Sequence, residues 1–141
     1  MKVLMLKGKD NCGKTTTINR VRDILLKESQ TIEMEPINKA DFSCVLLYRG
    51  LKVGIYSEGD YSTKIINKMN EYAEKGCDVF VCACNEFKKP QNKIQIYEGS
   101  ILINKTLCNI SISKEEANEK DTNSIINIIN QLFIDTVQNF V

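Results

Sequence analysis

Eight residues near the N-terminus have the types and spacing of a phosphate-binding loop. The segment reads GKDNCGKT over residues 8–15 and fits the pattern G-x-x-x-x-G-K-[ST] at every fixed position. Its two glycines allow the backbone to wrap tightly and to point successive N–H groups inward. The Lys14 ammonium is then placed to reach the β- and γ-phosphates of a nucleotide, and the Thr15 hydroxyl to ligate Mg²⁺.

The residues on either side of this loop predict the elements that would position it. Residues 2–6 read KVLML, a short apolar run typical of a buried strand. From Lys14 the apolar period becomes helical, with Ile18, Val21 and Leu25 on one face. The N-terminus of such a helix adds partial positive charge where the phosphates would sit. The residues expected to contact the nucleotide are Gly8, Asp10, Asn11, Cys12, Gly13, Lys14, Thr15 and Thr16.

The order of strand, Walker A loop and helix resembles the P-loop NTPases, in particular their kinase and GTPase division. The resemblance rests on residues 2–25, with a weaker match near residue 58. It implies an α/β fold of three layers over a single domain, residues 1–141, with a mainly parallel sheet and helices on both faces. It also implies a second acidic motif, the Walker B carboxylate, at the end of another strand.

The candidates for this carboxylate are Glu58 and Asp60, which follow the apolar residues 53–56. The usual pattern places Asp directly after four apolar residues, whereas here Ser57 and Glu58 come first. Asp60 also precedes a helical pattern and would make a good N-cap, so both roles stay open for it. We expect Lys14, Glu58 and Asp60 to be the catalytic residues. The expected metal ligands are Thr15, Glu58 and Asp60.

The two branches of the family predict different further motifs. Strands at 42–48 and 51–57, separated only by Arg49-Gly50, predict an antiparallel hairpin like that of small GTPases. The segment 38–41 reads NKAD and matches the guanine-reading motif as text, but it precedes the acidic motif, and we interpret it as a coincidence. Kinases usually add a lid with arginines, and this chain has three arginines. Lys88 and Lys89 could serve as cationic clamps instead, or belong to a solvated surface loop.

These observations predict a protein that binds a nucleoside triphosphate with Mg²⁺ and hydrolyses or transfers its terminal phosphate. We expect ATP, because the guanine-reading motif is not in its usual place, although GTP is possible. The alternatives are a regulatory nucleotide-binding module with negligible turnover, and a small kinase whose acceptor the sequence does not name.

Composition excludes several other classes of function. The 141 residues carry 19 basic and 18 acidic side chains, a net charge of +1, so nucleic acid is not implied as a partner. No apolar run is long enough to span a membrane, and no signal-peptide pattern is present, so we expect a cytoplasmic protein. Histidine is absent, which rules out a histidine base. Six cysteines form no C-x-x-C pair, and we interpret them as small buried hydrophobic residues.

The rest of the chain reads as alternating elements. We expect a first helix that ends near Glu28 and a second, around residues 65–73, that stops at Gly76. The run VFVCAC at 79–84 predicts a central parallel strand. Loops are expected at 29–41, 85–92 and 114–121, one or two strands within 93–112, and a long helix from Thr122.

Overall fold

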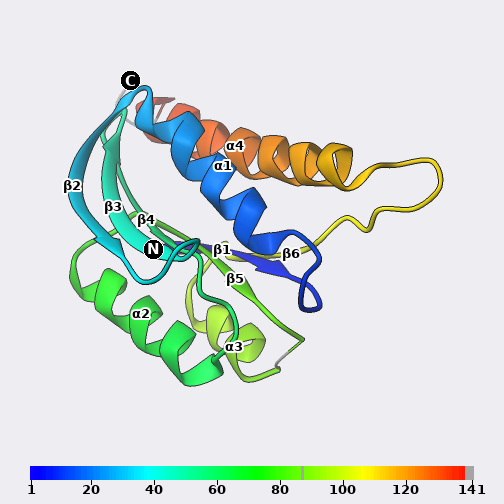
Figure 1. Ribbon diagram of the computed structural model, residues 1–141. Helices are drawn as coiled ribbons and strands as arrows, with labels where there is room; N and C mark the ends of the chain where they lie inside the picture. The colour runs from blue at the N-terminus through cyan, green and yellow to red at the C-terminus, as the bar shows by residue number, and fades with distance from the viewer. Residues whose placement is uncertain (87, 139–141) are drawn as a thin grey trace.

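Six strands form one sheet in the computed structural model, which describes residues 1–86 and 88–138 (Figure 1). The strands follow the spatial order β2-β3-β4-β5-β1-β6. Their bounds are β1 Lys2–Lys7, β2 Ser29–Pro36, β3 Phe42–Tyr48, β4 Leu51–Tyr56, β5 Val79–Cys84 and β6 Ile101–Asn104.

The sheet is mainly parallel, as the sequence predicts. Strand β1 pairs in parallel with β5 on one side and β6 on the other, and β4 also pairs in parallel with β5. Strand β3 runs antiparallel to both β2 and β4. The turn between β3 and β4 has positive φ at both Arg49 (49°) and Gly50 (83°), the backbone that a two-residue hairpin turn requires. The predicted hairpin is therefore confirmed.

Helices cover both faces of the sheet (Figure 1). Helices α1 (Lys14–Leu26) and α4 (Lys114–Gln138) lie on one face, and α2 (Ser62–Glu74) and α3 (Lys88–Lys93) on the other. A short 3₁₀ helix, η1, spans Ile94–Ile96. Because both faces are covered, alternate residues of a strand enter different cores, and β1 and β5 read as continuous apolar runs.

The two cores show this alternation directly. Leu4 and Leu6 of β1 belong to the core under α1 and α4, together with Ile18 and Ile125. The intervening Val3 and Met5 belong to the core under α2, with Ile65, Met69 and Tyr72. Among the described residues, no helix combines the length and the apolar character needed to cross a bilayer.

Three expectations about local structure are wrong. Residues 29–36 are a strand rather than part of a loop. Strand β2 lies at the edge of the sheet and its side chains are mostly exposed, so its sequence shows no apolar periodicity. Residues 88–93 form α3 within the expected loop 85–92, of which residue 87 lies outside the described residues. Residues 94–96 are a 3₁₀ helix and β6 is the one strand within 93–112, which agrees with the expected one or two strands.

The third error concerns the last helix. Helix α4 begins at Lys114 rather than at Thr122, so residues 114–121 are helical. The buried side of this first part carries small or polar residues, namely Ala117, Asn118 and Asp121. An apolar stripe is therefore missing from the sequence although the segment packs inward.

The cysteines differ in exposure more than the sequence suggests. Cys44, Cys77, Cys82 and Cys84 are buried, Cys12 is half-buried and Cys108 is exposed, and all six are free thiols. Burial raises the pKa of Cys44 to about 12 and those of Cys77 and Cys84 to about 11, and it also raises the pKa of Cys82. The prediction of buried thiols thus holds for four of the six.

These differences predict a graded reactivity toward a thiol reagent. At pH 8 Cys108 should react first and Cys12 more slowly, whereas the four buried cysteines stay unlabelled. Their raised pKa values keep the thiolate fraction small in the folded protein, and burial blocks the reagent. Iodoacetamide labelling followed by peptide mass mapping, in buffer and in denaturant, measures this order. Labelling of Cys82 in native protein at the rate of Cys108 would contradict the packing described.

Candidate nucleotide site

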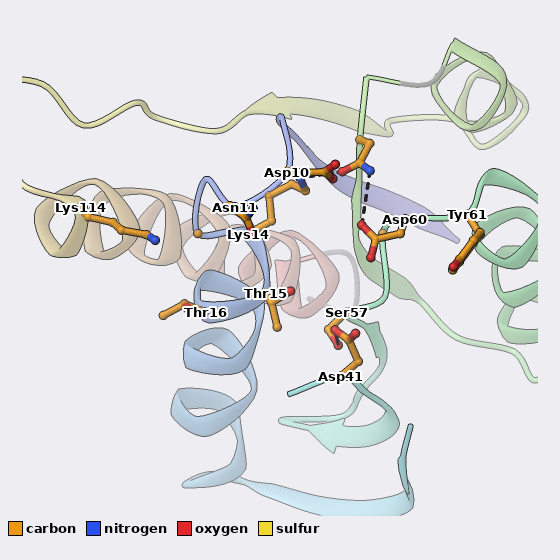
Figure 2. A pocket seen from close by; sticks show the side chains of 13 residues that line it. Asp10, Asn11, Lys14, Thr15, Thr16, Asp41, Ser57, Asp60, Tyr61 and Lys114 are labelled. Carbon is orange, nitrogen blue, oxygen red and sulfur yellow. Dashed lines mark hydrogen bonds between the residues drawn. The ribbon is translucent and has the colours of Figure 1, made fainter. Parts of the chain in front are cut away.

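A polar cavity of about 700 Å³ lies beyond the carboxyl ends of β1, β4 and β5 (Figure 2). Open α/β sheets bind ligands at this edge, because loops from several parallel strands converge there. The cavity is lined by Asp10, Asn11, Gly13, Lys14, Thr15, Thr16, Asp41, Ser57, Gly59, Asp60, Tyr61, Asn85 and Lys114.

The glycine-rich loop borders the cavity between β1 and α1. The Gly8 N–H donates a hydrogen bond to the Cys84 carbonyl oxygen (3.1 Å), which fastens the start of the loop to β5. Asn11 (φ 59°) and Gly13 (φ 95°) then turn the backbone through the left-handed region. Helix α1 begins without a side-chain cap and without an acidic residue in its first turn, so its N-terminal partial charge is not neutralised locally.

Lys14 is the most constrained side chain of the site. It is buried, and its Nζ atom donates to the carbonyl oxygens of Gly8 (2.7 Å) and Lys9 (2.6 Å) and to Asn85 Oδ1 (2.8 Å). The Asn85 amide in turn donates to Asp60 Oδ1 at 3.3 Å, the contact drawn in Figure 2. Asn85 therefore connects the loop lysine with an acid that follows β4.

Close packing behind the loop requires its glycines. A Cβ atom on Gly8 would lie 2.9 Å from Lys105 Cβ, and one on Gly13 would lie 2.3 Å from Asn118 Oδ1. Gly13 also has a positive φ that L-residues rarely adopt. The segment after β6 and the first part of α4 thus pack directly against the loop.

A buried ion pair holds this support in place. Lys105 Nζ lies 2.8 Å from Asp121 Oδ2, with side chains that are 0% and 5% exposed. Asp121 also accepts hydrogen bonds from the Thr106 N–H (2.8 Å) and the Thr106 hydroxyl (2.6 Å). The carboxylate of α4 therefore fixes the chain as it leaves β6.

The structure separates the two acidic candidates. Asp60 lines the cavity, but Glu58 does not, and its buried carboxylate forms an ion pair with Lys64 at 2.9 Å in a second cavity beside Tyr56. The segment between them passes against the end of β5, where a Cβ on Gly59 would lie 2.9 Å from the Ala83 oxygen. The expectation that Glu58 contributes to the same metal site is therefore not supported by the geometry.

The capping alternative for Asp60 is also wrong. The N-cap residue of α2 is Tyr61, and no side chain caps this helix. Asp60 is exposed and accepts one hydrogen bond, from Asn85. Its carboxylate is consequently available to a group bound in the cavity.

Most of the other predicted nucleotide contacts lie where the sequence places them. Asp10, Asn11, Gly13, Lys14, Thr15 and Thr16 all line the cavity. Gly8 and Cys12 do not, because Cys12 Sγ packs against the Gly8 backbone. Lys88 and Lys89 are exposed on α3 and do not line the cavity either.

Six residues of the cavity are not among those predicted from the sequence: Asp41, Ser57, Gly59, Tyr61, Asn85 and Lys114. Ser57 and Asn85 could have been found, because each directly follows an apolar strand whose carboxyl end faces the site. Asp41 and Lys114 fall in segments whose secondary structure was predicted wrongly or incompletely. The position of Lys114 depends on how α4 packs, and that of Asp41 on the pairing of β3 with β4.

The donors around the cavity suit a magnesium ion bound together with phosphates. Within residues 1–86 and 88–138, no three His, Cys, Asp or Glu side chains converge as a preformed metal cage. Magnesium typically takes one or two protein oxygens and completes its shell with phosphate oxygens and water. The Thr15 hydroxyl and the aspartate carboxylates of the lining supply oxygens of this kind.

No protein-family model, curated protein or solved structure matches this chain. Its function is therefore inferred from the geometry of the loop and the cavity.

The buried pair beneath the loop gives a prediction about stability. Asp121→Ala should lower the free energy of unfolding by about 3–5 kcal/mol, because it leaves the Lys105 ammonium buried without a partner. Urea denaturation of the two proteins measures the difference. Replacing both partners, Lys105→Met with Asp121→Leu, should recover much of the loss. A loss below about 1 kcal/mol for Asp121→Ala, the value of an exposed pair, would contradict this assignment.

Proposed function

We propose that this chain binds a nucleoside triphosphate with Mg²⁺, expected to be ATP, and hydrolyses or transfers its terminal phosphate. The observation that carries this proposal is the buried Lys14, held within a glycine-rich loop at the uncapped N-terminus of α1. The phosphates of a nucleotide bind to groups of this kind, namely a fixed ammonium and free N–H groups at a helix N-terminus.

The charges of the lining make the proposed binding depend on a metal. The cavity has two lysines, Lys14 and Lys114, against three aspartates, Asp10, Asp41 and Asp60. A free triphosphate carries several negative charges, which these carboxylates would repel. Magnesium neutralises part of the phosphate charge and polarises the terminal phosphoryl group. Thr15 and a cavity aspartate are the residues that would hold it.

Lys14 must exchange one partner to contact a phosphate. Its three N–H bonds are all donated, two to backbone carbonyls and one to the Asn85 side chain. The side-chain partner is the one that can rotate away, since the loop carbonyls are part of the fold. Asn85 would then remain beside Asp60, where the two can orient a water or an acceptor toward the terminal phosphate.

The expected preference for adenine rests on the place of the NKAD segment. Residues 38–41 connect β2 to β3, and their polar groups serve the turn itself. Asn38 Oδ1 accepts hydrogen bonds from the N–H groups of Ala40 and Asp41, and its amide donates to Asp41. The Asn38 side chain is thus occupied by the turn, which supports the interpretation of a coincidental match.

One observation favours a regulatory module with negligible turnover as the second candidate. Among the residues that the structure describes, no arginine lines the cavity to stabilise the charge of a transferring phosphoryl group. A phosphate-release assay on the MgATP complex separates the two candidates, because the module would bind without releasing phosphate. A kinase would also release little free phosphate, because it transfers the phosphoryl group to its acceptor and leaves ADP.

Nucleotide binding should depend on Lys14. At MgATP concentrations about a hundredfold above Kd, the ligand stabilises the fold by about 2.7 kcal/mol, which raises the melting temperature by several degrees. Lys14→Ala should remove most of this shift. The matched control is Lys120→Ala, an exposed lysine of α4 outside the cavity. An equal shift in the Lys14→Ala protein would show that the nucleotide binds elsewhere.

The base preference can be measured on the same scale. MgATP should give half of its maximal thermal shift at a lower concentration than MgGTP, because no guanine-reading segment faces the cavity in its usual place. Thermal shifts over matched concentration series of both nucleotides test this. If MgGTP gives half of its maximal shift at a tenfold lower concentration than MgATP, GTP is the ligand. Asp41 is then the residue to test by mutation for a contact with the guanine base.

A further inference from the structure

Ser57 occupies the position at which the resemblance to P-loop NTPases predicts the Walker B carboxylate. It directly follows the apolar end of β4, is 1% exposed as a residue, and belongs to the lining of the cavity. Its hydroxyl accepts a hydrogen bond from the Phe42 N–H (2.9 Å) and lies 3.0 Å from Asp41 Oδ1, to which it donates. A carboxylate is therefore present at the end of β4, but the neighbouring chain segment supplies it.

The Asp41 carboxylate is held by neutral groups. Oδ1 accepts from Ser57, and Oδ2 accepts from the Asn38 amide at 3.0 Å. Among residues 1–86 and 88–138, no lysine or arginine forms an ion pair with it, whereas Glu58 is paired with Lys64. Asp41 therefore presents to the cavity a negative charge that is fixed in position and not balanced by a cation of the chain.

The turn that carries Asp41 is tied to the helix that carries Thr15. The Asn19 amide donates to the Thr15 carbonyl oxygen (2.8 Å) and to the Ala40 carbonyl oxygen (3.1 Å). This single side chain links the first turns of α1 to the residue next to Asp41. Figure 2 shows Asp41 and Ser57 together at the wall of the cavity near Thr15.

We infer that Asp41, oriented by Ser57, is the carboxylate that holds the Mg²⁺ of the bound nucleotide opposite Thr15. This inference rests on the proposed function and names its cavity aspartate as Asp41, in place of the Asp60 expected from the sequence. Asp60 is exposed and has one hydrogen bond of 3.3 Å, whereas two donors fix Asp41 before any ligand arrives. A ligand fixed in advance loses less freedom when the metal binds.

The test compares nucleotide binding with and without the metal. Calorimetry with a non-hydrolysable ATP analogue gives Kd in excess Mg²⁺ and in EDTA, and the ratio Kd(EDTA)/Kd(Mg²⁺) measures how strongly the metal supports binding. In the parent protein this ratio should be well above one. Asp41→Asn keeps the size of the side chain and removes its charge, so the ratio should fall at least tenfold, mainly through weaker binding in Mg²⁺.

Three further variants separate a metal ligand from a structural residue. Ser57→Ala should lower the ratio by a smaller factor, since it frees the carboxylate without removing it. Asp60→Asn and Glu58→Gln should leave the ratio within twofold of the parent value. The double variant Asp41→Asn with Ser57→Asp should restore the ratio, because it returns a carboxylate to the end of β4.

Each result decides one of the two proposals. A parent protein that binds no analogue in Mg²⁺ overturns the proposed function. A parent that binds it, with an unchanged ratio in Asp41→Asn, overturns the metal assignment alone. Equal weakening in Mg²⁺ and EDTA also overturns it, because the residue then supports the fold. Should Asp41→Asn fail to fold, an unchanged ratio in Ser57→Ala overturns the assignment, and a lowered ratio supports it.

Discussion

The buried Lys14 ammonium determines how the site is assembled. A lysine enters a protein interior only when its charge and its three N–H bonds are satisfied. Here the loop satisfies two of these bonds by turning the carbonyl groups of Gly8 and Lys9 toward the side chain, and Asn85 satisfies the third. The loop thus closes around its own lysine, and the same contacts connect it to the end of β5.

The order of the strands explains why Asn85 has this position. Strand β5 lies between β1, which leads into the loop, and β4, which leads to Ser57 and Asp60. A residue directly after β5 is therefore flanked by the loop lysine on one side and by the acidic segment on the other. Parallel strands bring these three chain segments together although long stretches of sequence separate them.

Local patterns predict the central part of the fold and of the site. The loop, α1, the hairpin of β3 and β4, and β5 each carry a motif, a helical period, a turn pair or an apolar run, and the structure has all of them. The edge strand β2 and the start of α4 carry no such pattern, because one is exposed and the other buries polar side chains. Asp41 was missed although the hairpin of β3 and β4, which places it beside Ser57, is predicted, because no local motif marks a single aspartate before a strand as part of a site. The separation of Glu58 from Asp60 depends on the path past Ala83, which no local pattern encodes.

The contact between Gly13 and Asn118 joins the loop to the longest helix of the chain. There is no room for even one additional carbon atom between them. Helix α4 has 25 residues, so at about 1.5 Å per residue it extends for about 37 Å. The loop contacts this helix near its N-terminal end, at Asn118, so most of the helix extends beyond the contact. At the other end of the helix Leu132 and Phe133 pack against the core of the sheet, so α4 spans the distance from the loop to that end of the core.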